Sequence, residues 1–355
     1  MRALSNQKLR KSLYAYAIVI IGYAVIQVLA NGGGLSSAFE GQLVPICAYV
    51  VMALSLNLTV GVMGDLSLGH AGFMSVGAFS GAVACIALEN MIPVPALRLT
   101  ASIAVGAVCA GCAGVIIGIP VLRLKGDYLA IVTLAFGEII KNIITCFYVG
   151  QDNRGLRFGF LTSINDLNLG DGARTIIDGP MGLRSVPKLS SFTAGFILIL
   201  VTLAIILNLV NSRSGRAIMA LRDNRIAAES VGIPAAKYKL MAFVTSAALA
   251  GAAGTLYVLN FSTTVASKFN FNTSILILLF VVLGGLGNMW GSIVAAALLT
   301  VLPEMLRQFN NYRMLVYAIV LILVMLATNN SSVRTLVGKM KEAAALVFKK
   351  RGTGR

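Results

Sequence analysis

Charged side chains are scarce in this chain. Only 12% of its 355 residues are Asp, Glu, Lys or Arg, which is about half the fraction of an average soluble protein. Hydrophobic residues make up 57% of the chain. Several apolar runs approach about 20 residues, the length of a helix that crosses the hydrocarbon core of a bilayer. The composition therefore excludes an ordinary soluble domain and predicts an all-α polytopic membrane protein.

Acidic residues are the scarcer of the charged types, since 13 Asp and Glu stand against 29 Lys and Arg. The net charge of +16 is not gathered in a basic patch interleaved with aromatic residues, so we expect no nucleic-acid partner. Cytoplasmic loops of membrane proteins are enriched in Lys and Arg, and we assign the excess to them. The tail at 329–355, with Lys349, Lys350 and Arg351, is predicted to contact anionic membrane lipid.

Groups that bind metals, phosphates or reaction intermediates are also few. The only histidine is His70, and no serine-nucleophile pattern accompanies it or Asp65. No GxxxxGK[ST] loop occurs, so the chain has no such device for ATP. Cys109 and Cys112 form a CxxC pair inside the small-residue run AVCAGCAGVIIG, which favours helix packing over redox or metal chemistry. We predict that the chain is no enzyme and binds no metal or cofactor of its own.

Ten apolar segments predict about ten transmembrane helices. They cover residues 13–30, 41–62, 67–88, 99–122, 127–149, 191–210, 240–260, 273–288, 291–307 and 312–328. The first follows a basic segment at 1–12, and a cleaved signal peptide with Val28 and Ala30 as a weak cleavage pair is the alternative. We interpret the run as a retained helix because it is long and leads into further ones. The transmembrane domain then covers 13–328.

The distribution of basic residues predicts the orientation. With ten helices, both termini lie on one side together with the loops at 123–126 and 211–239, and these segments hold 19 of the 29 Lys and Arg. Both termini are therefore predicted to be cytoplasmic. The loop at 150–190 would be external. It contains four Asp and the sequence DGPMGL, which predicts a tight turn, and it either receives an extracytoplasmic partner or forms a solvated lid.

Two glycine-rich breaks interrupt apolar territory, GVMGDLSLGHAG at 61–72 and GGLGNMWG at 284–291. Irregular backbone at membrane depth is tolerated where it is buried in protein or lines a water-filled cavity. The two breaks can also mark corresponding points of two structural repeats. Ionisable and polar groups at or near membrane depth are site candidates. The candidate translocation path comprises Asp65, Ser67, His70 and Glu138.

Structural roles compete with transport roles for two of these residues. Glu138 and Lys141 are three residues apart on one helix and can neutralise each other. His70 can act as a hydrogen-bonding group at a helix end. Close helix contact is predicted where glycines recur at GxxxG spacing. These pairs are Gly77 with Gly81, Gly114 with Gly118, and Gly287 with Gly291.

The polar segment at 211–239 is predicted to present a short docking helix. Asp223 would cap the helix in NRIAAESV, and Gly232 would end it in a left-handed conformation before Pro234. The helix would show Ile226, Ala227 and Val231, and its small residues Ala227, Ala228 and Gly232 would let another protein's backbone approach closely. The alternative is a loop that only fixes topology through its positive charge.

Four motifs in order resemble one known family. LNLTVGVMGDLSLGHAGFMSVGA, LRLKGDYLAIVTLAFGEIIK, SGRAIMALRDNRIAAESVGI and VVLGGLGNMWGSIVAAALL are similar to the LivM-type membrane subunits of bacterial branched-chain amino acid ABC importers, from about residue 40 to 328. The external loop is longer than the family suggests. After residue 328 the chain reads NNSSVRTL, where the family often has a Pro-Gly turn.

The resemblance implies a multi-pass permease of the bacterial plasma membrane. Its partners would be a second homologous permease, two ATP-binding cassette subunits that use ATP, and an extracytoplasmic substrate-binding protein. It also implies that 211–239 is the coupling loop. Ala227, Ala228 and Gly232 match its AAxxxG core, with Ile226 where other importers begin with Glu. The candidate ATPase-docking residues are Arg222, Asp223, Ile226, Ala227, Ala228 and Gly232.

Transport by alternating access is the function that these features predict, with ATP consumed by the partner subunits. Relatives of this architecture carry leucine, isoleucine and valine, other amino acids, or urea-like amides, and no residue here separates these substrates. The alternative is a stand-alone proton-coupled secondary transporter of a small polar solute. That reading assigns Asp65, Glu138 or His70 to the proton site and predicts transport without an ATPase.

Overall fold

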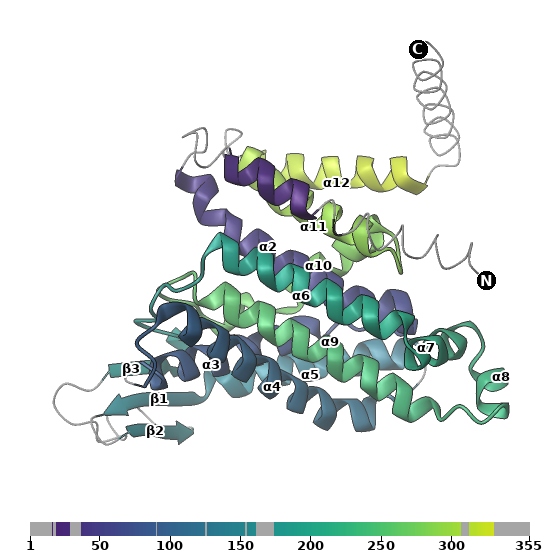
Figure 1. The fold of residues 1–355 in the computed structure, drawn as a ribbon, viewed down its shortest axis with the longest axis horizontal. Coiled ribbons are helices and arrows are strands. Elements are labelled where there is room, and N and C mark those ends of the chain that lie inside the picture. Colours follow the sequence, from purple (N-terminus) through teal and green to yellow (C-terminus); the bar gives the residue numbers. More distant parts are fainter. Residues whose placement is uncertain are drawn as a thin grey trace, which may run out of the picture. The chain divides into compact units, whose positions relative to one another are not determined.

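The computed structural model describes residues 16, 19–28, 37–89, 91–124, 126–152, 155–160, 174–306 and 312–329. The segment 1–12 and the basic tail, including Lys349, Lys350 and Arg351, lie outside the described residues. The chain divides into two compact units, residues 1–298 and 299–355. The fold is mainly helical, as predicted (Figure 1).

Each of the ten apolar segments coincides with a helix. Seven are long and apolar enough to cross a membrane: Phe39–Met63, His70–Ala87, Pro95–Val121, Asp127–Thr145, Phe192–Asn211, Ala235–Val258 and Ala266–Gly284. Three are shorter: Val19–Val28, α11 at Met289–Met305 and α12 at Arg313–Asn329. A multi-pass membrane protein is therefore confirmed, with about ten as the approximate number of helices that the hydropathy pattern detects.

Helices α3 (His70–Ala87), α4 (Pro95–Val121) and α9 (Ala235–Val258) pack against one another (Figure 1). Helix α2 (Ser37–Asn57) contacts α9, α6 (Phe192–Asn211) and α10 (Phe271–Gly284). Helices α2, α3 and α9 are mostly buried. This agrees with their sequences, in which apolar residues occur on every side of the helix and not along one face only.

Glycines allow this close approach. Gly77 of α3 lies so near Gly251 of α9 that a Cβ would overlap its backbone, and Gly114 of α4 packs on Ala247. Thr255 then donates its hydroxyl to the Gly77 carbonyl at 2.8 Å. The predicted close contacts at Gly77 and Gly114 are confirmed. Small residues let helix backbones meet and add van der Waals contact, which drives helix association in lipid.

A small sheet replaces part of the predicted external loop. Strands β1 (Phe147–Asp152), β2 (Gly155–Phe160) and β3 (Arg174–Asp178) form an antiparallel sheet in the order β2-β1-β3. The predicted fifth span to residue 149 was too long, because α5 (Asp127–Thr145) ends before β1 begins. The turn in DGPMGL is confirmed as a 3-10 turn at Gly179–Met181.

Candidate functional site: the α7–α8 loop and the broken segment after α2

Two short helices form the loop between α6 and α9, namely α7 (Arg213–Asp223) and α8 (Arg225–Ser230). The backbone of Asn224 is extended, and its side-chain oxygen accepts a hydrogen bond from the Ala227 N–H at 3.0 Å. The predicted cap, Asp223, was wrong by one residue. Asp223 is the last residue of α7, and its carboxylate accepts hydrogen bonds from Arg222 instead.

The end of α8 follows the prediction. Gly232 has a φ of +87°, the left-handed conformation that a glycine adopts without steric penalty. Its N–H donates to the Glu229 carbonyl at 3.0 Å, and the Ile233 N–H donates to the Ala228 carbonyl at 3.1 Å. These bonds satisfy carbonyls that a helix end leaves free. Helix α9 begins directly after Pro234, so the loop holds α8 between two defined ends.

The apolar side chains of α8 divide into an exposed and a buried set. Ile226 is 82% exposed and Val231 is 76% exposed, and Ala227 is exposed beside them. Ala228 is only 5% exposed because it packs with Leu221 and Ala235. The expected accessibility of Ala228 was therefore wrong, since the side chain fills the interior of its own loop. Exposed apolar residues on so small a helix form a surface that a partner can cover.

The break at 61–72 begins as a π-helix. Helix α2 continues into Leu58–Met63 with this wider winding, and Gly64, at a φ of +81°, ends it. The backbone then stays non-helical until His70 opens α3. Short π-helical turns are rare and occur often at functional sites. The broken segment, defined here as residues 58–69, thus lies between two buried helices, as the sequence predicted.

The second predicted break lies against the first. Asn57, at the end of α2, accepts a hydrogen bond from the Gly287 N–H at 2.8 Å and donates one to Ser292 at 2.9 Å. Gly61 sits so close to Gly287 that a Cβ on it would overlap the Gly287 backbone. The structure therefore brings the two glycine-rich breaks together. Their interpretation as corresponding points of two repeats stays a prediction.

The α7–α8 loop also contacts the broken segment. Nη1 of Arg222 donates to the Gly61 carbonyl at 2.8 Å. Nζ of Lys239, in the first turns of α9, lies 2.7 and 2.8 Å from the two carboxylate oxygens of Asp65. Lys239 was not predicted from the sequence as the partner of Asp65. A lysine near the start of an otherwise apolar helix was the signal, because such a charge needs a partner.

The other two candidates from this segment lie in different surroundings. His70 is 2% exposed, and its Nε2 lies 2.7 Å from the Ser55 hydroxyl. It opens α3, which fits the predicted role as a hydrogen-bonding group at a helix end. Ser67 is fully buried, and its hydroxyl has no hydrogen-bond partner among the described residues.

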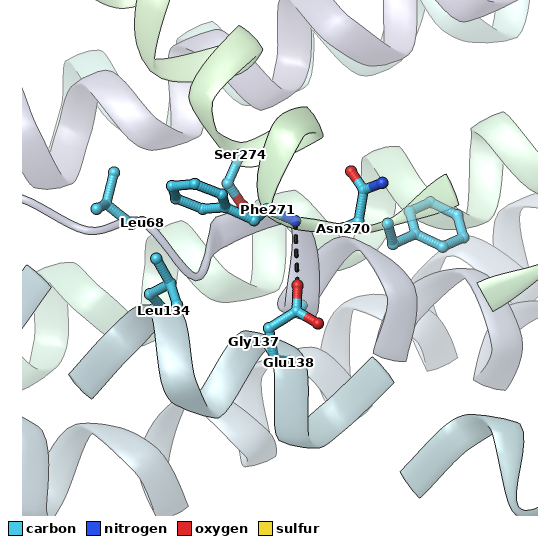
Figure 2. Close-up of a pocket in the computed structure, with 9 residues that line it drawn as sticks. Leu68, Leu134, Gly137, Glu138, Asn270, Phe271 and Ser274 are labelled. Atoms are coloured by element: carbon cyan, nitrogen blue, oxygen red, sulfur yellow. Dashed lines mark hydrogen bonds between the residues drawn. The ribbon is translucent and has the colours of Figure 1, made fainter. Parts of the chain in front are cut away.

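Glu138 lines a pocket between α3, α5 and the start of α10 (Figure 2). Its Oε1 accepts the Phe271 N–H at 3.2 Å, and its Oε2 pairs with Lys141, as the spacing predicted. The pocket is a small, partly open hollow, and its space of about 180 Å³ includes open solvent. Its lining residues are Leu68, Gly72, Leu134, Gly137, Glu138, Phe269, Asn270, Phe271 and Ser274. A charged group beside leucine and phenylalanine side chains can meet both the charged and the aliphatic parts of a small ligand.

Among the described residues, no group of three or more His, Cys, Asp or Glu is placed to hold a metal ion. The cysteines are free thiols, and Cys109 and Cys112 lie on α4, which packs against α3 and α9. The candidate site therefore consists of ion pairs, buried hydrogen bonds and the exposed apolar side chains of Ile226 and Val231.

Comparison with known proteins shows similarity to transport permeases. The family model described as "Branched-chain amino acid transport system / permease component" matches residues 38–325. The "High-affinity branched-chain amino acid transport system permease protein LivM" of Salmonella typhimurium is 32% identical over 339 residues, covering 91% of this chain and 75% of the relative. The protein of the same name from Escherichia coli is 32% identical over 335 residues, with the same coverage of both chains. The "Fructose import permease protein FruG" of Bifidobacterium longum is 28% identical over 302 residues, covering 82% of this chain and 81% of the relative.

Proposed function

Because the chain belongs to the family of branched-chain amino acid transport permease components, we propose that it forms the translocation path of an ATP-driven importer of leucine, isoleucine and valine. The observation that carries the substrate class is the 32% identity, over 91% of the chain, to a relative named for branched-chain amino acid transport. The apolar helices give the chain the means to span the membrane, and ATP is used by partner subunits.

The proposed partners are two ATP-binding cassette subunits, a second homologous permease and an extracytoplasmic substrate-binding protein. The ATPase contact is assigned to the exposed part of the loop, namely Ile226, Ala227, Val231 and Gly232. This assignment is supported by the exposure of these residues at the tip of a well-capped helix. With 19 of the 29 Lys and Arg on that side, the loop and both chain ends are proposed to be cytoplasmic. The β1–β3 sheet would then be external.

The substrate path is proposed to pass the pocket at Glu138. A branched-chain amino acid carries an ammonium group, a carboxylate and an aliphatic side chain. Glu138 can accept hydrogen bonds from the ammonium group, Lys141 beside it can meet the carboxylate, and Leu68 and Leu134 offer apolar surface. Asp65 and Ser67 lie in the broken segment, whose Leu68 lines this pocket, and His70 opens α3 directly after it. Both acids have a lysine partner, but 32% of the Glu138 side chain is exposed against 17% of the Asp65 side chain, so Glu138 is the more accessible of the two.

Alternating access follows from differential binding. A partner can shift the permease between an outward and an inward state only if it binds one of them better. In this proposal ATP binding brings the two ATPase subunits together, and the α8 helices that they hold move with them. The permease then changes the side to which its path opens.

Reconstitution tests the proposal. The chain is purified with the subunits that accompany it, placed in vesicles with its substrate-binding protein, and assayed for uptake of radiolabelled leucine and of fructose. ATP-dependent leucine uptake is the expected result. Fructose uptake without leucine uptake would contradict the proposed substrate and would favour a sugar, as in the name of the FruG relative. Leucine uptake without ATP, driven by a pH gradient, would support the proton-coupled alternative instead.

A further inference from the structure

Arg222, the residue before the last of α7, contacts the broken segment while 40% of its side chain stays exposed. Its Nη1 reaches the Gly61 carbonyl at 2.8 Å, and its side-chain methylene groups lie where a Cβ on Gly64 would be. Asp223 holds the other edge of the guanidinium, because its carboxylate accepts hydrogen bonds from Nε at 3.2 Å and from Nη2 at 3.1 Å. On the neighbouring helix α8, Ile226 is more exposed still, at 82%.

The carbonyl that Arg222 contacts belongs to a helix end. Carbonyls in the last turn of a helix have no partner within that helix, so they need one from elsewhere. Gly61 lies in this last turn, directly before Gly64 ends the π-helix. Its other side is closed by Gly287 of the second break. Arg222 therefore joins the loop to a point at which the two breaks meet.

A second contact, an ion pair, lies close to the first. Lys239, in the first turns of α9, pairs with Asp65, two residues beyond Met63, where the π-helix ends. The broken segment is thus held by polar contacts on either side of α8 in the sequence, from Arg222 at the end of α7 and from Lys239 in α9. Movement of the loop as a body would pull on Gly61 and on Asp65 together.

We propose that Arg222 is a positioning residue that transmits movement of the α7–α8 loop to the broken segment, and that it is not an ATPase-docking residue. This replaces the docking role expected from the sequence. The inference rests on the proposed function, since it assigns a part of the same transport cycle. Ile226 and Val231 contact the ATPase subunit, and Arg222 transmits the movement of the loop to the broken segment through its hydrogen bond to the Gly61 carbonyl.

The test separates assembly from coupling. Arg222→Gln removes the guanidinium, and the matched control Arg216→Gln removes the same charge from an exposed position of the same helix, where Arg216 donates to the Asn211 carbonyl at 3.3 Å. Each complex is purified, its ATPase content is measured, and the leucine transported per ATP hydrolysed is determined in vesicles. We expect full ATPase content in both variants and a transport-to-ATP ratio at least about tenfold lower in Arg222→Gln only, in line with loss of a charge-assisted hydrogen bond.

Loss of the ATPase from the Arg222→Gln complex would show a docking role and overturn the proposal, and so would an unchanged ratio. Should the glutamine variant fail to fold, Arg222→Met decides. Methionine keeps an unbranched apolar stem but has no hydrogen-bond donor for the Gly61 carbonyl, so a reduced ratio at full ATPase content supports the proposal and a wild-type ratio overturns it. Failure of the proposed function itself would be recognised separately, because the wild-type complex would then show no ATP-dependent leucine uptake.

Discussion

The ion pair between Lys239 and Asp65 is expected to be the most sensitive polar contact of the loop. Both side chains are largely buried, with 11% of the lysine and 17% of the aspartate side chain exposed, and the atoms lie 2.7 Å apart. Removing one member of such a pair leaves the other charge buried without compensation, which costs about 3–5 kcal/mol. The residual exposure favours the lower end, so we expect Lys239→Met to lower the free energy of unfolding by about 3 kcal/mol, a roughly 100-fold change in the equilibrium constant.

Removing both charges is expected to restore much of this loss. Without Lys239 and Asp65 there is no charge to desolvate, and replacement of a buried ion pair by neutral groups is often close to neutral. The double variant Asp65→Asn with Lys239→Met is therefore expected within about 1 kcal/mol of the wild type. Lys237→Met is the matched control, because Lys237 is exposed two residues earlier on α9 and its loss should change stability by less than about 0.5 kcal/mol.

The assay is unfolding of the purified permease in mixed micelles titrated with sodium dodecyl sulfate, followed by circular dichroism. The comparison between the single and double variants measures the coupling of the pair. If Lys239→Met were as stable as Lys237→Met, the pair would be screened by solvent, and the inference that it holds the broken segment would be refuted. Additive losses in the double variant would refute it equally, because two independent sites do not rescue each other.

Three further outcomes are expected. Asn224→Ala removes the cap of α8 and should reduce the protection of the α8 amides in hydrogen exchange by about 1 kcal/mol. Asp223→Ala removes only an exposed ion pair and should change this protection by less than about 0.5 kcal/mol. Equal effects of the two variants would contradict the assignment of the cap to Asn224. Glu138→Gln keeps an acceptor for the Phe271 N–H but loses the charge that an ammonium group needs, so leucine uptake by the reconstituted complex should fall about tenfold at unchanged ATPase content; unchanged uptake would remove Glu138 from the path. Gly77→Leu must push α3 away from α9 and should lower the free energy of unfolding by about 3 kcal/mol or more in the same detergent titration, and wild-type stability would contradict the close helix contact.

The positions of the membrane helices could be predicted because length and apolarity are local properties of the sequence. Each of the ten apolar segments coincides with a helix, and the shift from α2 to the break was marked by Gly61, Gly64 and Asp65. The sheet was missed for the opposite reason. Its strands are only five or six residues long, and β1 follows α5 without a polar boundary, so the apolar pattern continued across the junction.

Errors in the loop arose where neighbouring residues have the same chemistry. Asp223 and Asn224 are both good helix caps, and only the backbone conformation decides which one acts. Ala227 and Ala228 are identical side chains one position apart. A helix turns by about 100° between them, because it has 3.6 residues per turn, so one faces outward while the other packs on Leu221. A pattern of small residues alone does not fix that rotation.

Contacts that tie the loop to the broken segment could not be read from local patterns, since they join residues far apart in the chain. Arg222 and Gly61 are separated by 161 positions, and Lys239 and Asp65 by 174. The requirement that buried charges be paired would nevertheless have reduced the number of candidate partners for Asp65 and Lys239. An acid beside a break at membrane depth needs a cation, and a lysine in the first turns of a buried helix needs an anion. Arg222 gave no such signal, because an arginine in a polar loop is satisfied by water, and its partner is a backbone carbonyl that becomes available only where the π-helix ends.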